Sequence, residues 1–148
     1  MKALALALLF VASAALAAEQ TAFGIAGDAS KVTRTIAIDM SDDMRYAPAT
    51  LDVRLGETVR FVVANKGATM HELVLGTPND IAQHAQAMAK TPAGMAPHNH
   101  RLPSMVHVHP GSTGEVVWRF NRAGTFTYAC LIPGHYEAGM KGTVNVGK

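Results

Sequence analysis

The feature that most restricts the fold is a repeated alternation of apolar and polar residues in short runs separated by turn residues. Period-2 alternation is typical of β-strands with one buried face, and Gly, Asn and Lys-Gly clusters between the runs are typical of turns. The expected strands cover 32–39, 51–55, 59–63, 70–75, 115–120, 125–130 and 143–146. So many short strands in a chain of 148 residues predict a single all-β domain, a β-sandwich or barrel.

One long stretch, 77–113, has no strand pattern and is expected to be an insertion. Its first part, 80–90, has a helical spacing of apolar residues, with Asn79 as the expected N-cap and Pro92 as the expected stop. The residues expected on the buried stripe are Ile81, Ala85, Met88 and Ala89. The remainder is a loop with Pro, Met and His, and a loop this long in a small domain is usually functional or disordered.

The N-terminal residues 1–18 have the pattern of a signal peptide. A lysine at position 2 precedes an apolar run over 3–11, and Ala15-Leu16-Ala17 matches a cleavage site after Ala17 or Ala18. The run is shorter than the roughly 20 residues of a membrane-spanning helix, so we expect a mature chain without a membrane span, in the periplasm. An uncleaved membrane anchor is the alternative. The small and polar residues 19–31 predict a flexible start, and the domain itself is expected over 32–148.

Composition excludes several classes of protein. Lys and Arg total 13 against 11 Asp and Glu, and a net charge of +2 argues against nucleic acid as a partner. A single cysteine excludes an intramolecular disulfide framework and a site with four cysteine ligands. In an exported protein an unpaired cysteine needs a reason: a buried bystander, an intermolecular disulfide or a metal thiolate.

The neighbours of Cys130 favour the metal thiolate. Cys130, His135 and Met140 share one turn-rich segment after a predicted strand, and alternation places His71 on an inward face. Two imidazoles, a thiolate and a weak thioether are the ligand set of a blue-copper site, whereas zinc prefers four strong ligands. The alternatives are that Cys130, His71 and Met140 are ordinary core residues.

These motifs resemble the cupredoxins, the plastocyanin- and azurin-like blue copper proteins. The likeness rests on Cys130-x₄-His135-x₄-Met140, on His71 after the turn at 65–67, and on the stretches 56–61 and 142–144. It implies a Greek-key β-sandwich with one type 1 copper ion at one end, held by His71, Cys130, His135 and Met140. The helix and the Met/His-bearing insertion resemble periplasmic cupredoxins associated with copper resistance.

The insertion is also rich in soft and borderline metal-binding side chains. They are Met88, Met95, His98, His100, Met105, His107 and His109. One interpretation is an accessory surface that binds further copper weakly. The other is a solvated loop in which Met88 caps the core. Met40 and Met44 form another pair of soft side chains, for which we favour strand-end packing of Met40.

Two functions therefore remain: copper handling for metal tolerance, which the insertion favours, and one-electron transfer to a redox partner. An enzyme, such as a copper oxidase or reductase, would need a second copper site, so none is expected. Besides the copper ion, the expected partner is a periplasmic redox or copper-transfer protein. It would meet the small and apolar residues around His135, namely Leu131, Ile132, Pro133, Gly134 and Ala138.

Overall fold

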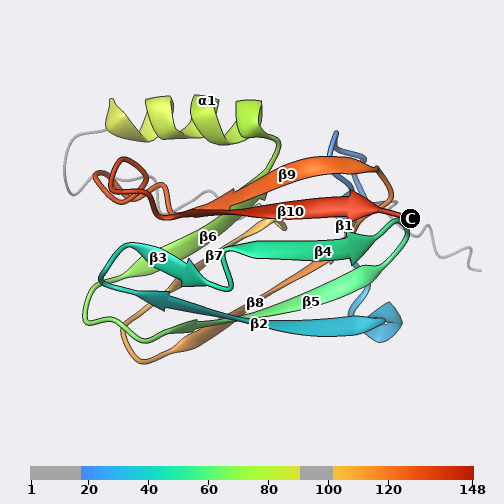
Figure 1. Cartoon of the computed structure of the whole chain (residues 1–148), viewed down its shortest axis with the longest axis horizontal. Helices are drawn as coiled ribbons and strands as arrows, with labels where there is room; N and C mark the ends of the chain where they lie inside the picture. Colours follow the sequence, from blue (N-terminus) through green and yellow to red (C-terminus); the bar gives the residue numbers. More distant parts are fainter. Residues whose placement is uncertain (1–17, 91–101) are drawn as a thin grey trace, which may run out of the picture.

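In the computed structural model, two β-sheets pack face to face, and one α-helix lies across the outer face of one of them (Figure 1). The structure describes residues 18–90 and 102–148. One sheet has the strand order β1-β8-β5-β2-β3 and the other the order β4-β10-β9-β6-β7. The strands are β1 (Ile25–Ala26), β2 (Arg34–Ser41), β3 (Arg45–Ala47), β4 (Thr50–Arg54), β5 (Thr58–Asn65), β6 (His71–Gly76), β7 (Met105–Val108), β8 (Thr113–Arg119), β9 (Gly124–Ala129) and β10 (Lys141–Gly147). The predicted β-sandwich with a helix in its insertion is confirmed.

The strand pairing shows that the chain passes from sheet to sheet. β2 pairs with β5 and β4 pairs with β10 in parallel, and the other pairs are antiparallel. Parallel neighbours require a connection that leaves the sheet, which here runs through the opposite sheet. In the second sheet β6 and β9 lie side by side, with Val74 opposite Ala129. The start of β6 and the end of β9 therefore meet at one end of the sandwich.

The main core fills the space between the sheets, because alternate residues of each strand point inward. In β4, for example, Leu51 and Val53 are buried while their neighbours are exposed. Aromatic rings occupy much of the core: Phe61 meets Phe120 edge-on, and Phe23 stacks on Trp118 with 4.8 Å between ring centroids.

A second, smaller core lies on the outer face of the β4-β10-β9-β6-β7 sheet, under α1 (Pro78–Ala89). It consists of Val74, Ile81, Met88, Ala129 and Leu131. Because this core covers the outer face and the main core covers the inner one, all six residues of β6 are buried.

The helix begins two residues earlier than predicted, at Pro78. Thr77, rather than Asn79, is the N-cap: its Oγ1 accepts from the backbone N–H of Asp80, and the Asp80 carboxylate accepts from the N–H of Thr77. This reciprocal capping box satisfies two N–H groups that a helix start otherwise leaves free, and Pro78 suits the first turn.

The structure differs from the predicted organisation in two segments. The stretch 77–113 contains strand β7, which pairs with β6 from His71↔Val108 to Val74↔Met105 and so belongs to the second sheet. The segment 19–31, expected to be flexible, packs on the sandwich: β1 pairs with β8, and Phe23 is buried. Both were missed because a two- or four-residue strand at a sheet edge is too short to show alternation.

Some of the sequence predictions fall outside the described residues. They include residues 1–17 of the predicted signal peptide and, within 91–101, Pro92, Met95, His98 and His100. Among the described residues, no helix has the length and apolar character needed to cross a membrane.

Candidate metal centre

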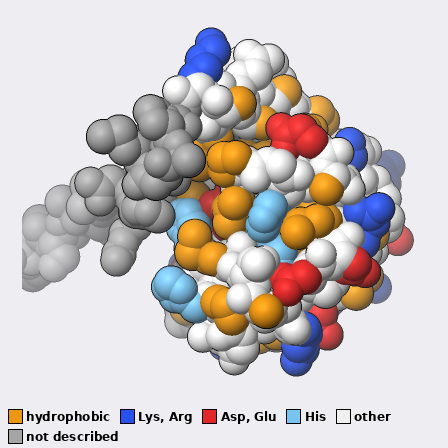
Figure 2. All heavy atoms as spheres, turned by 90° about the vertical axis from the view of Figure 1, so that its left-hand side faces the viewer, with side chains coloured by type: hydrophobic (Ala, Val, Ile, Leu, Met, Phe, Trp, Pro, Cys, Tyr) orange, Lys and Arg blue, Asp and Glu red, His pale blue; other side chains and the backbone are white. Residues whose placement is uncertain are grey.

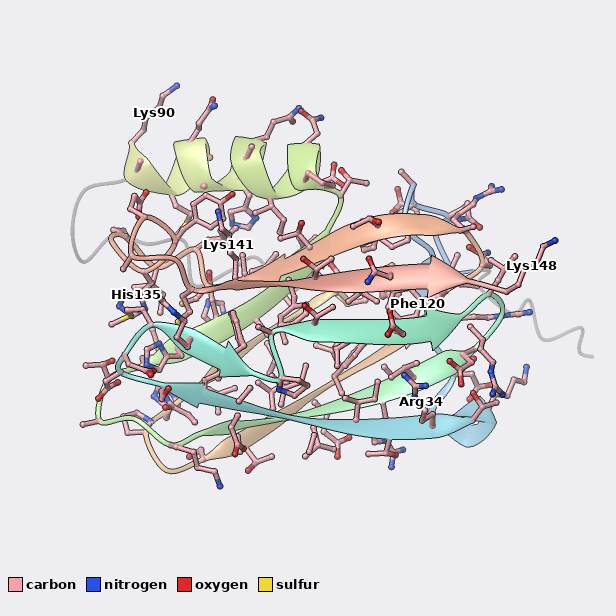
Figure 3. The ribbon with its side chains drawn as sticks, in the orientation of Figure 1. Arg34, Lys90, Phe120, His135, Lys141 and Lys148 are labelled. Atoms are coloured by element: carbon pink, nitrogen blue, oxygen red, sulfur yellow. The ribbon has the colours of Figure 1, made fainter. Side chains whose placement is uncertain are left out.

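The segment between β9 and β10 closes on itself at the end of the sandwich. The N–H of Cys130 donates to the carbonyl of Met140 at 3.1 Å, and the N–H of Met140 donates to the carbonyl of His135 at 3.0 Å. Gly134 and Gly139 allow this curl, with φ angles of 89° and 99° that L-residues with side chains rarely adopt. Figure 3 shows the His135 side chain at this end, away from the end that carries Phe120.

Three candidate ligand atoms converge beside this loop. Nδ1 of His135 lies 3.2 Å from Nδ1 of His71 and 3.3 Å from Sγ of Cys130. All three ligand atoms lie within 4.8 Å of one another. Two of the residues come from the loop and the third from the first position of β6, so the cluster exists because β6 and β9 are neighbours.

The two spacings from Nδ1 of His135 suit a shared metal ion. Imidazole nitrogens and thiolate sulfurs about 2.0–2.3 Å from one ion, at angles near tetrahedral, are separated by roughly 3.2–3.5 Å. The donors are two nitrogens and one sulfur, a borderline-to-soft set that suits copper and zinc better than magnesium or calcium. The residues present therefore fit a trigonal copper site.

A carboxylate fixes the His71 ring from behind. Nε2 of His71 lies 2.9 Å from Oδ1 of Asp42, and Asp42 is in turn held by the N–H of Ala68 at 2.6 Å and by the hydroxyl of Thr69 at 2.8 Å. The hydrogen bond from Ala68, followed by those from His71 and Thr69, holds the pKa of Asp42 well below its usual range. A carboxylate that stays ionised only accepts hydrogen bonds, so Nε2 of His71 carries the proton and Nδ1 keeps its lone pair for a metal.

Burial sets the charge state of the other two donors. It raises the pKa of the Cys130 thiol to about 12, and the side chain is completely buried. Burial, and then the nearby His71, lower the pKa of His135. The site therefore disfavours both a free thiolate and an imidazolium, and a cation that binds the sulfur must displace its proton.

Met140 lies in the main core beside Cys130. It is fully buried, belongs to the same apolar cluster as Cys130, and shares backbone hydrogen bonds with both Cys130 and His135. Its role as an axial ligand stays a prediction.

A second carboxylate near the site, Glu72, was not identified from the sequence. It is 1% exposed and lies on the α1 side of β6. Its Oε1 accepts from the N–H of Leu131 at 2.8 Å, and its Oε2 lies 2.8 Å from Nε2 of His107. This hydrogen bond raises the pKa of His107. The sequence did offer one clue: an acidic residue inside a predicted strand, on the same face as the apolar Val74.

The four accessory candidates that the structure describes do not share one surface. Met88 is buried in the small core under α1, and the half-buried Met105 packs against this core. Core packing therefore accounts for both methionines. His107 faces Glu72, and His109 is exposed. Of the other methionine pair, Met40 is fully buried, as strand-end packing predicts, and Met44 lies half-buried against the main core.

Apolar side chains lie around His135, beside the exposed carboxylates of Asp42 and Glu137. Figure 2 shows histidine side chains among hydrophobic ones at this end of the molecule. His135 and Ile132 are half-buried, and Pro133 and Ala138 are exposed. Leu131, which was expected in this surface, is instead buried in the small core, because it points toward α1.

Comparison with known proteins agrees with this geometry. The family described as copper binding proteins, plastocyanin/azurin family, matches residues 32–147. The copper-resistant cuproprotein CopI of Rubrivivax gelatinosus is 52% identical over 85% of this chain and 74% of its own length, and the CopI of Pseudomonas aeruginosa is 36% identical over 95% and 92%. In fold, the chain resembles auracyanin from Roseiflexus castenholzii, with a TM-score of 0.64 and 24% identity over 79% of this chain and 99% of that one.

Proposed function

The chain belongs to the plastocyanin/azurin family of copper-binding proteins, and from this premise we propose that it holds one copper ion between His71, Cys130 and His135, with Met140 as a weak axial ligand. The observation that carries the proposal is the convergence of two Nδ1 atoms and one Sγ at the end of the sandwich. Copper is the metal, as the family and this donor set both indicate.

The chain's own residues would perform three tasks at this site. Asp42 keeps Nδ1 of His71 free of a proton, and the buried Cys130 supplies sulfur once its proton has left. The closed loop from Cys130 to Met140 keeps its donors in place when the charge at the site changes. Copper bound there supplies a one-electron Cu(I)/Cu(II) couple.

We further propose that the protein serves copper handling for metal tolerance in the periplasm. The support is its similarity to two proteins named copper-resistant cuproproteins, one of them at 52% identity. These relatives are copper-binding proteins rather than enzymes, and we assign no catalytic role. The electron-transfer alternative is not favoured by these relatives. A copper-transfer protein that meets the apolar surface around His135 remains the proposed protein partner.

The first experiment measures the visible spectrum and the copper content of the purified protein loaded with Cu(II), beside Cys130→Ser. We expect an intense thiolate-to-copper band with one tightly held copper per chain, and loss of the band in Cys130→Ser. Asp43→Asn, which changes an exposed carboxylate next to Asp42, is the matched control and keeps the band. A wild-type protein without the band contradicts the proposed site.

The second experiment tests tolerance. A copper-sensitive bacterial strain that produces the wild-type protein should grow at higher copper concentrations than the same strain with Cys130→Ser at equal protein levels. Equal growth of the two strains contradicts a role of this site in tolerance. If the wild-type protein shows the band but the two strains grow equally, the protein binds copper at this site without a role of the site in tolerance.

A further inference from the structure

Arg45 joins the start of β3 to the loop that carries His135 and Met140. Its Nη1 donates to the carbonyl of Ala138 at 2.9 Å, across 93 positions of the chain, and to the carbonyl of its own neighbour Met44 at 2.8 Å. One terminal guanidinium nitrogen carries two N–H groups, so both bonds can form at once. The side chain therefore bridges the turn between β2 and β3 and the loop between β9 and β10.

The backbone at Gly139 lets the guanidinium group come close to the loop. A Cβ at this position would lie 3.1 Å from Nη1 of Arg45, closer than an ordinary van der Waals contact. The φ angle of 99° at Gly139 also disfavours a side chain there. The residue next to Ala138 is thus shaped both for the turn and for the approach of Arg45.

The bond from Arg45 links the loop to the other sheet. Within the loop, backbone N–H groups donate to the carbonyls of Gly134, His135 and Tyr136, and these bonds close the loop on itself. The carbonyl of Ala138 instead accepts from β3, a strand of the β1-β8-β5-β2-β3 sheet, whereas β9 and β10 belong to the other sheet. Arg45 therefore ties the two sheets together at the end that carries the candidate ligands.

The turn that precedes Arg45 also anchors the other candidate histidine. Oδ1 of Asp42, in the same turn between β2 and β3, lies 2.9 Å from Nε2 of His71. This turn thus contacts both segments that bring histidine donors to the site, the start of β6 through Asp42 and the loop through Arg45.

We propose that Arg45 is a positioning residue of the copper site, which fixes the segment between His135 and Met140 relative to the β2–β3 turn through the carbonyl of Ala138. The inference rests on the proposed copper site and adds to it a support that touches no ligand atom. Because Asp42 holds His71 from the same turn, the place of one histidine relative to the other depends on this bond.

The experiment compares Arg45→Gln with Arg34→Gln in the full chain. The glutamine side chain is uncharged and too short to bridge both carbonyls at position 45. Arg34 is the matched control, because its Nη2 donates at 2.6 Å to the carbonyl of Asp52, also in the other sheet. Figure 3 shows Arg34 and His135 at opposite ends of the molecule. Each variant removes one positive charge and one bond between the sheets.

Two readouts are taken. The first is the rate at which the copper-loaded protein releases Cu(II) to an excess of chelator, at low salt and at about 1 M salt, with the thiolate–copper band recorded throughout. The Debye length falls to about 3 Å at 1 M salt, so an effect of the exposed charge alone is screened there, whereas the loss of a hydrogen bond persists. The second readout is hydrogen exchange of the backbone N–H groups in the copper-free protein.

We expect Arg45→Gln to speed copper release roughly three- to tenfold at both salt concentrations, as for the loss of one hydrogen bond, and to shift the energy of the band. In the copper-free variant, the N–H groups of Ala138, Gly139 and Met140 should exchange faster by roughly the same factor, because the loop opens more readily. Arg34→Gln should leave copper release, the band and the exchange of these three groups at wild-type values.

Three results overturn the inference: Arg45→Gln behaves as Arg34→Gln does, its effect on copper release disappears at high salt, or exchange rises equally throughout both sheets. The last result would show a general loss of stability. A wild-type protein with no thiolate–copper band would instead contradict the proposed function, and hydrogen exchange in the copper-free proteins would still decide whether Arg45 holds the loop.

Discussion

Oδ1 of Asp42 lies 2.9 Å from Nε2 of His71, so the imidazole that reaches the candidate site is anchored to a carboxylate on its far side. Asp42 belongs to the turn after β2, and His71 begins β6. The N–H of Ala68 and the hydroxyl of Thr69 hold the same carboxylate. The anion therefore selects the tautomer of His71 that leaves Nδ1 free for a metal.

Asp42→Ala should weaken Cu(II) binding by about 10–100-fold, the usual loss when the partner behind a ligating histidine is removed. It should also raise the reduction potential, because the lost negative charge stabilises Cu(II) more than Cu(I). Competition titration against a chelator and a redox titration measure these effects. Asp43→Asn is the control, and equal affinities for the two variants would show that Asp42 has no part in the site.

The copper-free protein should lose stability at alkaline pH because of Cys130. Burial raises the pKa of this thiol from its ordinary value near 9 to about 12, so the unfolded chain loses the proton at a lower pH than the folded chain. The stabilisation is complete below pH 9 and is lost as the pH rises from 9 toward 12. Between pH 8 and 10 the free energy of unfolding should fall by about 1.4 kcal/mol more in the wild type than in Cys130→Ala. Urea unfolding of both proteins checks this, and parallel pH curves would contradict it.

Met140→Leu separates an axial ligand from a core residue. The change nearly conserves volume, so the copper-free protein should lose less than about 1.5 kcal/mol of stability. If the thioether is a ligand, the copper-loaded variant keeps its thiolate–copper band but has a higher reduction potential, because a donor to the oxidised ion is gone. Met40→Leu, an equally buried change, should leave the potential unaltered. An unchanged potential in Met140→Leu would leave Met140 a core residue only.

The accessory-copper hypothesis is best tested without deleting 92–109, since such a deletion removes β7 and with it one of the two partners of β6. Substitution of Met95, His98 and His100 by Ser leaves the described strands intact. We expect the variant to keep its tightly held copper and to lose additional weak copper, measured by equilibrium dialysis. Cys130→Ser should show the converse. Identical copper binding by wild type and triple variant would leave the insertion without a copper-binding role.

Most strands of the sandwich could be predicted from the sequence, and so could the part of the candidate site that lies in the loop from Cys130 to Met140. Alternation located the long strands, and Cys130, His135 and Met140 could be proposed as ligands because they are close in sequence. His71 could be placed on the inner face by alternation with Leu73 and Leu75, which are both buried.

The supporting carboxylates could not be found in the same way. Asp42 meets His71 across 29 positions of the chain, and Glu72 meets Leu131 across 59. Such contacts depend on which strands become neighbours, and local periodicity carries no information on that pairing. The edge strand β7 was hidden for a related reason: its pairing partner, rather than its own pattern, makes it a strand.

The double burial of β6 has a consequence for how this protein tolerates variation. A strand with one solvent-exposed face accepts many substitutions at every second position, whereas all six residues of β6 are buried. A saturation library should therefore show β6 as a continuous block of intolerance from His71 to Gly76, beside a striped pattern in β4. We therefore expect natural variation mainly in strands other than β6, which begins at the proposed copper site.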